Sequence, residues 1–105
     1  MTIRIDVYRN RIIIHHRGES SEFVSLKPFT TTRLLIGDYL AARECLIRGF
    51  KDMGIRRYFY PFVLMRPDIH FYPKEMCEGG FSPVEIRTFE ELGFTLRASN
   101  VEIIF

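Results

Sequence analysis

Residues 82–105, SPVEIRTFEELGFTLRASNVEIIF, predict a capped helix followed by a strand. Ser82 is a favoured N-cap residue, and Pro83 suits the first helical position. Glu85 stands three residues after Ser82, which is the spacing of a capping box. The segment therefore supplies one helix and one strand of a domain in which the two kinds of element alternate.

The apolar residues of this segment predict how it packs. Val84, Phe89 and Leu92 are expected on the buried side of the helix. Gly93 is expected to mark the end of the helix, because glycine is the commonest residue just past a helix C-terminus. Residues 101–105 are rich in β-branched side chains and favour a terminal strand.

Three strands are predicted before residue 28. Apolar and polar residues alternate in residues 3–8, which indicates a strand with one apolar face. Arg9-Asn10 is a predicted tight turn, because asparagine tolerates positive φ. Residues 12–15 form the second predicted strand, residues 17–21 interrupt the pattern, and residues 23–26 form the third.

A change of period at Thr31 predicts the first helix, and Gly54 is its expected stop. Residues 55–73 are ambiguous, because they are apolar and aromatic but contain three prolines; residues 69–72 are the expected strand within them. The stripe of the first helix has spacings of three and four and consists of Leu35, Tyr39, Ala42, Leu46, Phe50 and Met53.

The resulting order is β-β-β-α-β-α-β. Helices between the later strands imply parallel pairing there, after an antiparallel start. We therefore expect an α/β (α+β) single domain over residues 1–105, with a mixed five-stranded sheet packed by two helices. This order is the core topology of ribonuclease H-like and actin-like domains.

Composition narrows the class of protein. The chain has 105 residues, 47% of them hydrophobic, and this supports a packed domain. A net charge of +2 gives no general reason to expect nucleic acid. Cys45 and Cys77 lack metal-ligand spacing and suit a reducing cytoplasm. Neither a signal peptide nor a membrane-spanning run is expected, so the predicted location is cytoplasmic.

Four motifs in order resemble the bacterial actin homologue MreB family, over about residues 28–105. Pro28 also stands where the family has a proline shortly before the first of these motifs. The resemblance implies an actin-like half-domain, a degenerate first subdomain, with links to the cytoskeleton and cell shape. The matching segments are Ile36-Gly37-Asp38-Tyr39 at the start of the helix in residues 34–53, Met65-Arg66-Pro67, Ser82-Pro83-Val84-Glu85-Ile86-Arg87 and Val101-Glu102-Ile103-Ile104.

The departures from this family argue against ATP hydrolysis. Actin-like ATPases hold phosphate with a glycine-containing turn after an aspartate on the first strand, where backbone N–H groups approach the phosphate closely. Asp6 stands at that aspartate, but Val7-Tyr8-Arg9-Asn10 follows it without glycine. The family's catalytic glutamate follows the last strand, and this sequence ends at Phe105. We expect no enzyme activity, nucleotide, metal or other cofactor.

Other catalytic interpretations are weaker. Ribonuclease H-like chemistry needs clustered carboxylates for two metal ions, and Asp6 and Asp38 are a minimal set for which surface or capping roles are favoured. His15 and His16 are adjacent on a strand and point to opposite faces, so they cannot chelate one ion together. Cys45 is expected in the core, and whether Cys77 is reactive stays open.

A basic and aromatic run is the candidate interaction patch. Three interpretations stay open: a core or edge strand, a protein interface, and a membrane contact in which apolar side chains enter the acyl boundary. Pro61 weakens the first of these. The patch consists of Arg56, Arg57, Tyr58, Tyr60, Phe62, Val63, Leu64, Met65 and Arg66.

The expected function is a non-enzymatic, actin-like interaction module. Its expected partner is a cytoskeletal or membrane-associated protein or a second copy, with peripheral contact at the inner face of the membrane as one form of this. The alternatives are a small ribonuclease H-like nuclease that depends on metal and a nucleic-acid-binding module. The basic residues are scattered among acids, so nucleic acid ranks last.

Overall fold

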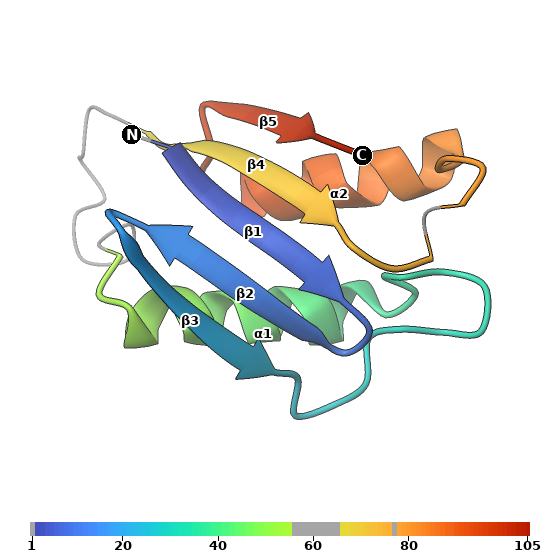
Figure 1. Cartoon of the computed structure of the whole chain (residues 1–105), viewed down its shortest axis with the longest axis horizontal. Helices are drawn as coiled ribbons and strands as arrows, with labels where there is room; N and C mark the ends of the chain where they lie inside the picture. The colour runs from blue at the N-terminus through green and yellow to red at the C-terminus, as the bar shows by residue number, and fades with distance from the viewer. Residues whose placement is uncertain (1, 56–65, 77) are drawn as a thin grey trace.

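The computed structural model describes residues 2–55, 66–76 and 78–105. Its elements follow the expected order β-β-β-α-β-α-β (Figure 1). Their bounds are β1 Thr2–Tyr8, β2 Arg11–His16, β3 Glu19–Val24, α1 Tyr39–Asp52, β4 Asp68–Pro73, α2 Pro83–Thr95 and β5 Asn100–Ile103.

One mixed sheet contains all five strands, in the order β3-β2-β1-β4-β5. The β1–β2 and β2–β3 pairs are antiparallel, and the β1–β4 and β4–β5 pairs are parallel. The predicted fold class, a mixed five-stranded sheet packed by two helices, is therefore confirmed. Neither helix in the described residues has the length and apolar character needed to cross a bilayer.

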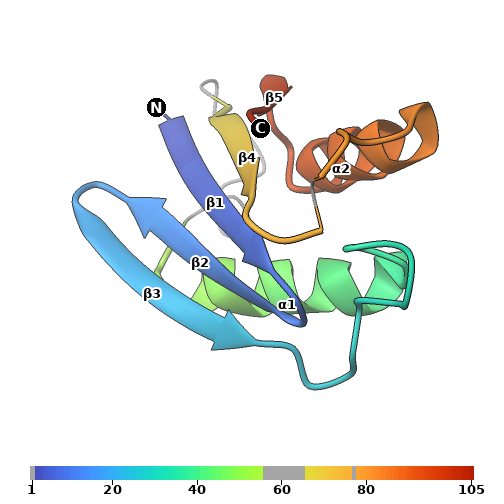
Figure 2. The same ribbon diagram turned by 45° about the vertical axis from the view of Figure 1, so that its right-hand side comes forward.

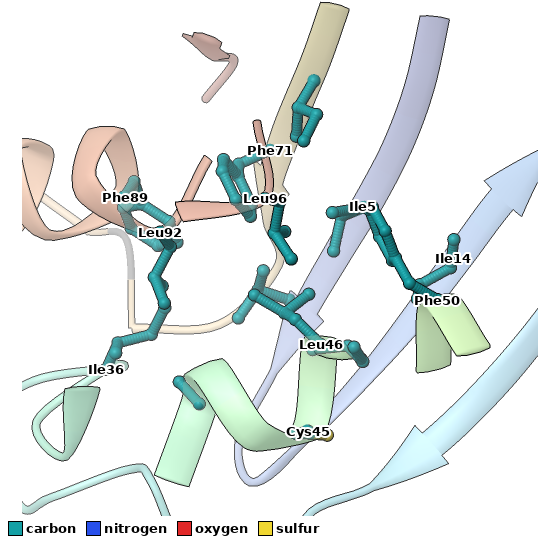
Figure 3. Packing of buried hydrophobic residues seen from close by; sticks show 14 of the residues in the cluster. Ile5, Ile14, Ile36, Cys45, Leu46, Phe50, Phe71, Phe89, Leu92 and Leu96 are labelled. Carbon is teal, nitrogen blue, oxygen red and sulfur yellow. The ribbon is translucent and has the colours of Figure 1, made fainter. Parts of the chain in front are cut away.

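Both helices cover the same face of the sheet (Figures 1 and 2). Alternate residues of the strands point into the layer between sheet and helices, among them Ile5, Ile14 and Phe71, each fully buried. Leu46 and Phe50 of α1 and Phe89 and Leu92 of α2 meet them from the other side (Figure 3). Burial of this apolar surface is the main term that holds the two layers together.

Helix α1 begins later than the predicted start near residue 31. Asp38 is its N-cap, and the Asp38 side chain accepts a hydrogen bond from Ala41 N at 3.1 Å. Leu35 is buried as expected but lies in the loop before the helix. Leu35 stands four residues before Tyr39, which is a helical spacing, so the apolar pattern alone placed this loop residue in the helix. The predicted stop is confirmed, because Gly54 has φ of +69° just after the C-cap Met53.

Strand β3 also differs from its prediction. It covers Glu19–Val24 instead of residues 23–26, because Arg17 and Gly18 both have positive φ and close a two-residue turn. Pairing resumes at once, with His16 opposite Glu19. The predicted Arg9-Asn10 turn is confirmed: Tyr8 pairs with Arg11, and Asn10 has φ of 59°.

Helix α2 begins as predicted, with Ser82 as the N-cap and Pro83 inside the first turn. Phe89 and Leu92 are buried, but Val84 is 69% exposed, so its expected place in the core is wrong. Gly93 does not end the helix, which continues to Thr95. Gly93 is there for packing: a Cβ at this position would lie 2.3 Å from Val101 Cγ2 on β5.

We expect Gly93→Ala to lower the free energy of unfolding by about 1 kcal/mol. Overpacking costs about 1–3 kcal/mol, which outweighs the gain of up to about 1 kcal/mol from better helix propensity. In a Val101→Ala background both Cγ atoms are gone and only the Cβ of residue 101 stays close, at 3.3 Å, so the same Gly93→Ala change should become nearly neutral or stabilising. Urea unfolding of the four proteins of this cycle measures the effect. An effect of the same sign in both backgrounds would contradict the packing role of Gly93.

Candidate functional site

The face of the sheet opposite the helices carries no covering element in the described part of the chain (Figure 2). We call it the open face. Strand register places one row of side chains across all five strands: Ser20, His15, Arg4, His70 and Glu102. The next rows add Glu22, Ile13, Asp6 and Tyr72, and then Val24, Arg11 and Tyr8.

Asp6 lies at the centre of the open face on β1. It is the one buried charged residue in the described part of the chain, with 5% of its surface exposed. Arg4 Nε donates to Asp6 Oδ1 at 2.8 Å, and His15 Nε2 lies 2.9 Å from Asp6 Oδ2. Both oxygens of a buried carboxylate are thus satisfied by cross-strand or same-strand partners, as burial of a charge requires.

The electrostatic balance keeps Asp6 ionised. Burial raises the pKa of Asp6. The hydrogen bonds from Arg4 and His15 and the positive charge of Arg4 lower it, and together they outweigh the effect of burial. The net result is a pKa of Asp6 below its ordinary value. Asp6 is therefore a hydrogen-bond acceptor through both oxygens at neutral pH.

The ionised carboxylate sets the tautomer of His15. Because Asp6 can only accept, His15 Nε2 carries the proton that lies between them. Nδ1 of a neutral His15 is then an acceptor, and Ser20 Oγ lies 2.6 Å from it and donates to it. Ser20, His15 and Asp6 form one continuous hydrogen-bonded chain from β3 through β2 to β1.

Arginine and tyrosine side chains stack beside this chain. The Arg4 guanidinium lies 4.1 Å from the centre of the Tyr72 ring, and the Arg11 guanidinium lies 4.0 Å from that of Tyr8. Arg11 Nη1 also donates to Glu22 Oε1 at 2.6 Å. Stacking and ion pairing hold these long side chains in fixed positions on the surface, which lowers the entropy they lose on binding a partner.

The charges of the open face alternate in sign. Arg4 pairs with Asp6, Arg11 with Glu22, and His70 Nε2 lies 3.4 Å from Glu102 Oε2. Cations and carboxylates are thus interleaved across the sheet. Such a surface has no large field of one sign, which binding of a phosphate backbone requires.

The β1–β2 turn, where the actin-like resemblance would place phosphate, is filled by the chain itself. Arg9 N donates to the Glu75 carboxylate at 2.6 Å. The Asn10 side chain accepts from the backbone N–H groups of Phe29 and Thr30, at 3.0 and 2.8 Å. The backbone N–H of Arg9 is therefore already paired with an anion of the chain itself.

The two candidate acidic residues do not meet. Asp6 points to the open face, whereas Asp38 caps α1 in the helical layer, so the structure does not support the less favoured interpretation of the two as a metal-binding set. The capping role favoured for Asp38 is confirmed. Within residues 2–55, 66–76 and 78–105, no group of three or more histidine, cysteine or acidic residues is arranged to hold a metal ion.

The histidine and cysteine residues considered in the sequence analysis lie in different parts of the fold. His15 lies on the open face, and His16 follows it on the opposite side of β2, as strand alternation predicts. Burial and the nearby charge of Arg17 lower the pKa of His16. Cys45 is buried as predicted, and burial raises the pKa of its thiol. Cys77 lies outside the described residues.

The candidate interaction patch lies almost wholly outside the described residues. Only Arg66 of the patch is described, as an exposed residue just before β4. The choice between a strand, a protein interface and a membrane contact therefore stays a prediction for residues 56–65.

The open face was not identified from the sequence, although its signals are present. The alternation Arg4-Ile5-Asp6 marks one polar face of β1, and two-residue turns fix the register of β1, β2 and β3. From these turns, Arg4 falls opposite His15, and His15 opposite Ser20. The turn after His16 was expected to be longer, which concealed the second of these pairs.

Comparisons with family models, with curated proteins and with solved structures found no match to this chain. The actin-like resemblance therefore rests on the sequence motifs alone.

Proposed function

We propose that this chain is a non-enzymatic interaction module that binds a protein surface through its open face. The observation that carries the proposal is the side of β1, β4 and β5 that no element of the described residues covers. These three strands are parallel neighbours, and parallel strands are rarely left with one face bare. A partner that covers the open face completes the layered arrangement.

The side chains of the open face support a protein as the partner. Tyr8, Tyr72, Arg4 and Arg11 are aromatic or arginine residues, which are enriched at protein interfaces and at their energetic centres. The ring contacts of Arg4 and Arg11 hold these groups in place before binding. Interleaved charges favour a partner with complementary alternating charges over a nucleic acid.

The class of partner follows from the resemblance stated above. An actin-like half-domain without nucleotide elements suits a second copy of itself or a filament of an actin-like protein. The proposed location is the cytoplasm, with a membrane-associated filament as the setting for peripheral contact.

Arg11→Glu tests the proposal against a matched control, Arg87→Glu. Arg11 lies on the open face, whereas Arg87 is exposed on α2 in the helical layer. Both substitutions change the net charge equally. Self-association is measured by sedimentation equilibrium, and filament binding by co-sedimentation with a purified bacterial actin homologue. We expect Arg11→Glu to weaken binding by about tenfold or more, and Arg87→Glu to leave it unchanged.

Two outcomes would overturn the proposal. One is the absence of both self-association and filament binding by the unmodified protein at its highest soluble concentration. The other is equal weakening by Arg11→Glu and Arg87→Glu, because this would place the interface elsewhere or make the effect one of net charge alone.

A further inference from the structure

The chain of contacts Ser20–His15–Asp6 has the connectivity of a serine nucleophile, its base and the carboxylate that orients the base. Ser20 Oγ lies 2.6 Å from His15 Nδ1, and His15 Nε2 lies 2.9 Å from Asp6 Oδ2. We propose that Ser20 is an activated nucleophile that accepts an acyl group from small activated esters. This site goes beyond the proposed binding function and is independent of it.

The roles of the three residues follow from their surroundings. Arg4 holds the Asp6 carboxylate from its other oxygen, so Asp6 keeps one fixed orientation toward His15. Asp6 in turn keeps the His15 proton on Nε2 and directs the lone pair of Nδ1 to the Ser20 hydroxyl. This is the logic by which serine hydrolases are recognised, from geometry and roles, with the two ring nitrogens exchanged here.

Access is the second requirement, and the open face provides it. Ser20 is an exposed residue of β3, while Asp6 is buried beneath its partners. An ester can therefore approach the hydroxyl from solvent, and water is kept from the carboxylate. Ser21, the next residue, is also exposed but points to the other side of β3, away from His15.

The step balances as an acyl transfer. Ser20 Oγ attacks the ester carbonyl carbon and forms a new C–O bond, while its proton moves to His15 Nδ1. The bond from the carbonyl carbon to the leaving oxygen breaks, and the leaving group departs as an alcohol or phenolate. His15 gives up the proton to the leaving group or to solvent, and Ser20 is left as an ester. A positioned general base contributes about 100-fold or more to such a step.

Labelling with p-nitrophenyl acetate at pH 8 tests the proposal. Samples are quenched in acid, and peptide fragmentation by mass spectrometry assigns acetyl groups to Ser20 or Ser21. We expect Ser20 to be acetylated about 100-fold faster than Ser21 in the same molecules. His15→Gln should bring the Ser20 rate close to that of Ser21.

Two more variants separate the chemistry from general effects. Asp6→Asn should slow Ser20 acetylation at least tenfold, because an amide no longer fixes the tautomer of His15. Glu90→Gln changes an exposed carboxylate of α2, on the other side of the sheet, and should leave the rate unchanged. Equal rates at Ser20 and Ser21 in the unmodified protein would overturn the proposal, whatever the folding of the variants. So would an undiminished rate in a folded His15→Gln protein.

Discussion

Phe71→Ala is expected to lower the free energy of unfolding by about 3–5 kcal/mol. Phe71 is fully buried on β4, and β4 pairs with β1 on one side and β5 on the other. Its ring centre lies 5.3 Å from that of Phe89 on α2, at an interplanar angle of 48° (Figure 3). The substitution removes an aromatic side chain from the junction of three strands and a helix.

The size of this effect follows from two contributions. Removal of the ring forfeits its transfer free energy and leaves a cavity that the surrounding strands cannot fill, because β4 is held on both sides. It also removes the tilted ring contact with Phe89, worth about 0.5–1.5 kcal/mol. A domain of this size has a total stability of about 5–15 kcal/mol, so the variant should lose a large share of it.

Urea unfolding of Phe71→Ala and Phe94→Ala measures the difference. Phe94 is a phenylalanine of α2 that is 56% exposed, so its removal should change stability by only about 0.5 kcal/mol. Equal losses in the two variants would contradict the packing of α2 and β4 described here.

Asp6→Asn is expected to lower the free energy of unfolding by about 1–3 kcal/mol at neutral pH. The change keeps the shape of the side chain but removes the negative charge that Arg4 and His15 share. An amide can accept through one oxygen only, so one of these two partners loses its acceptor. The loss is limited because the side chains of Arg4 and His15 are partly exposed and water can solvate them.

The difference between the unmodified protein and Asp6→Asn should depend on pH. The pKa of Asp6 is lower in the folded protein than in the unfolded chain, so the folded state favours the ionised form. This contribution is fully present above the unfolded pKa, about 3.9, and is lost as pH falls through the lower folded pKa. The stability gap should therefore be constant near neutral pH and shrink below about pH 4.

Thermal or urea unfolding from pH 7 to pH 2 measures this gap. Glu22→Gln is the control, because Glu22 pairs with Arg11 on the same face but is half exposed. An exposed ion pair contributes only about 0–1 kcal/mol, so this variant should show a small effect. A gap for Asp6→Asn that stays constant to pH 2 would show that the charge of Asp6 is not the source of its contribution.

The order of elements could be predicted because it depends on local patterns. Ile3, Ile5 and Val7 alternate with polar residues, and this period determines both the strand and its buried face. Ser82 and Pro83 determine the start of α2 in the same way, through contacts within one turn of the helix. Such signals need no knowledge of what the segment packs against.

Errors arose where a residue has two roles that look alike in sequence. Gly93 was expected to end a helix, as glycine often does, but the close approach of Val101 on β5 is what requires it. Val84 has an apolar side chain at the start of α2, yet the first turn extends beyond the sheet and leaves it exposed. In both cases the role of the residue depends on whether another element packs against it, and local patterns of the sequence do not show this.

The sequence by itself determined the fold class, the buried face of β1 and the start of α2, because these follow from periodicity and capping within short segments. Only the tertiary structure decided that Arg4, Asp6, His15 and Ser20 form one connected site. Their meeting depends on strand register, which two tight turns set, and on the placement of both helices on the opposite face. A shift of one residue in the first turn would move His15 to the core face, and a shift in the second would move Ser20 there, so either shift would abolish the site.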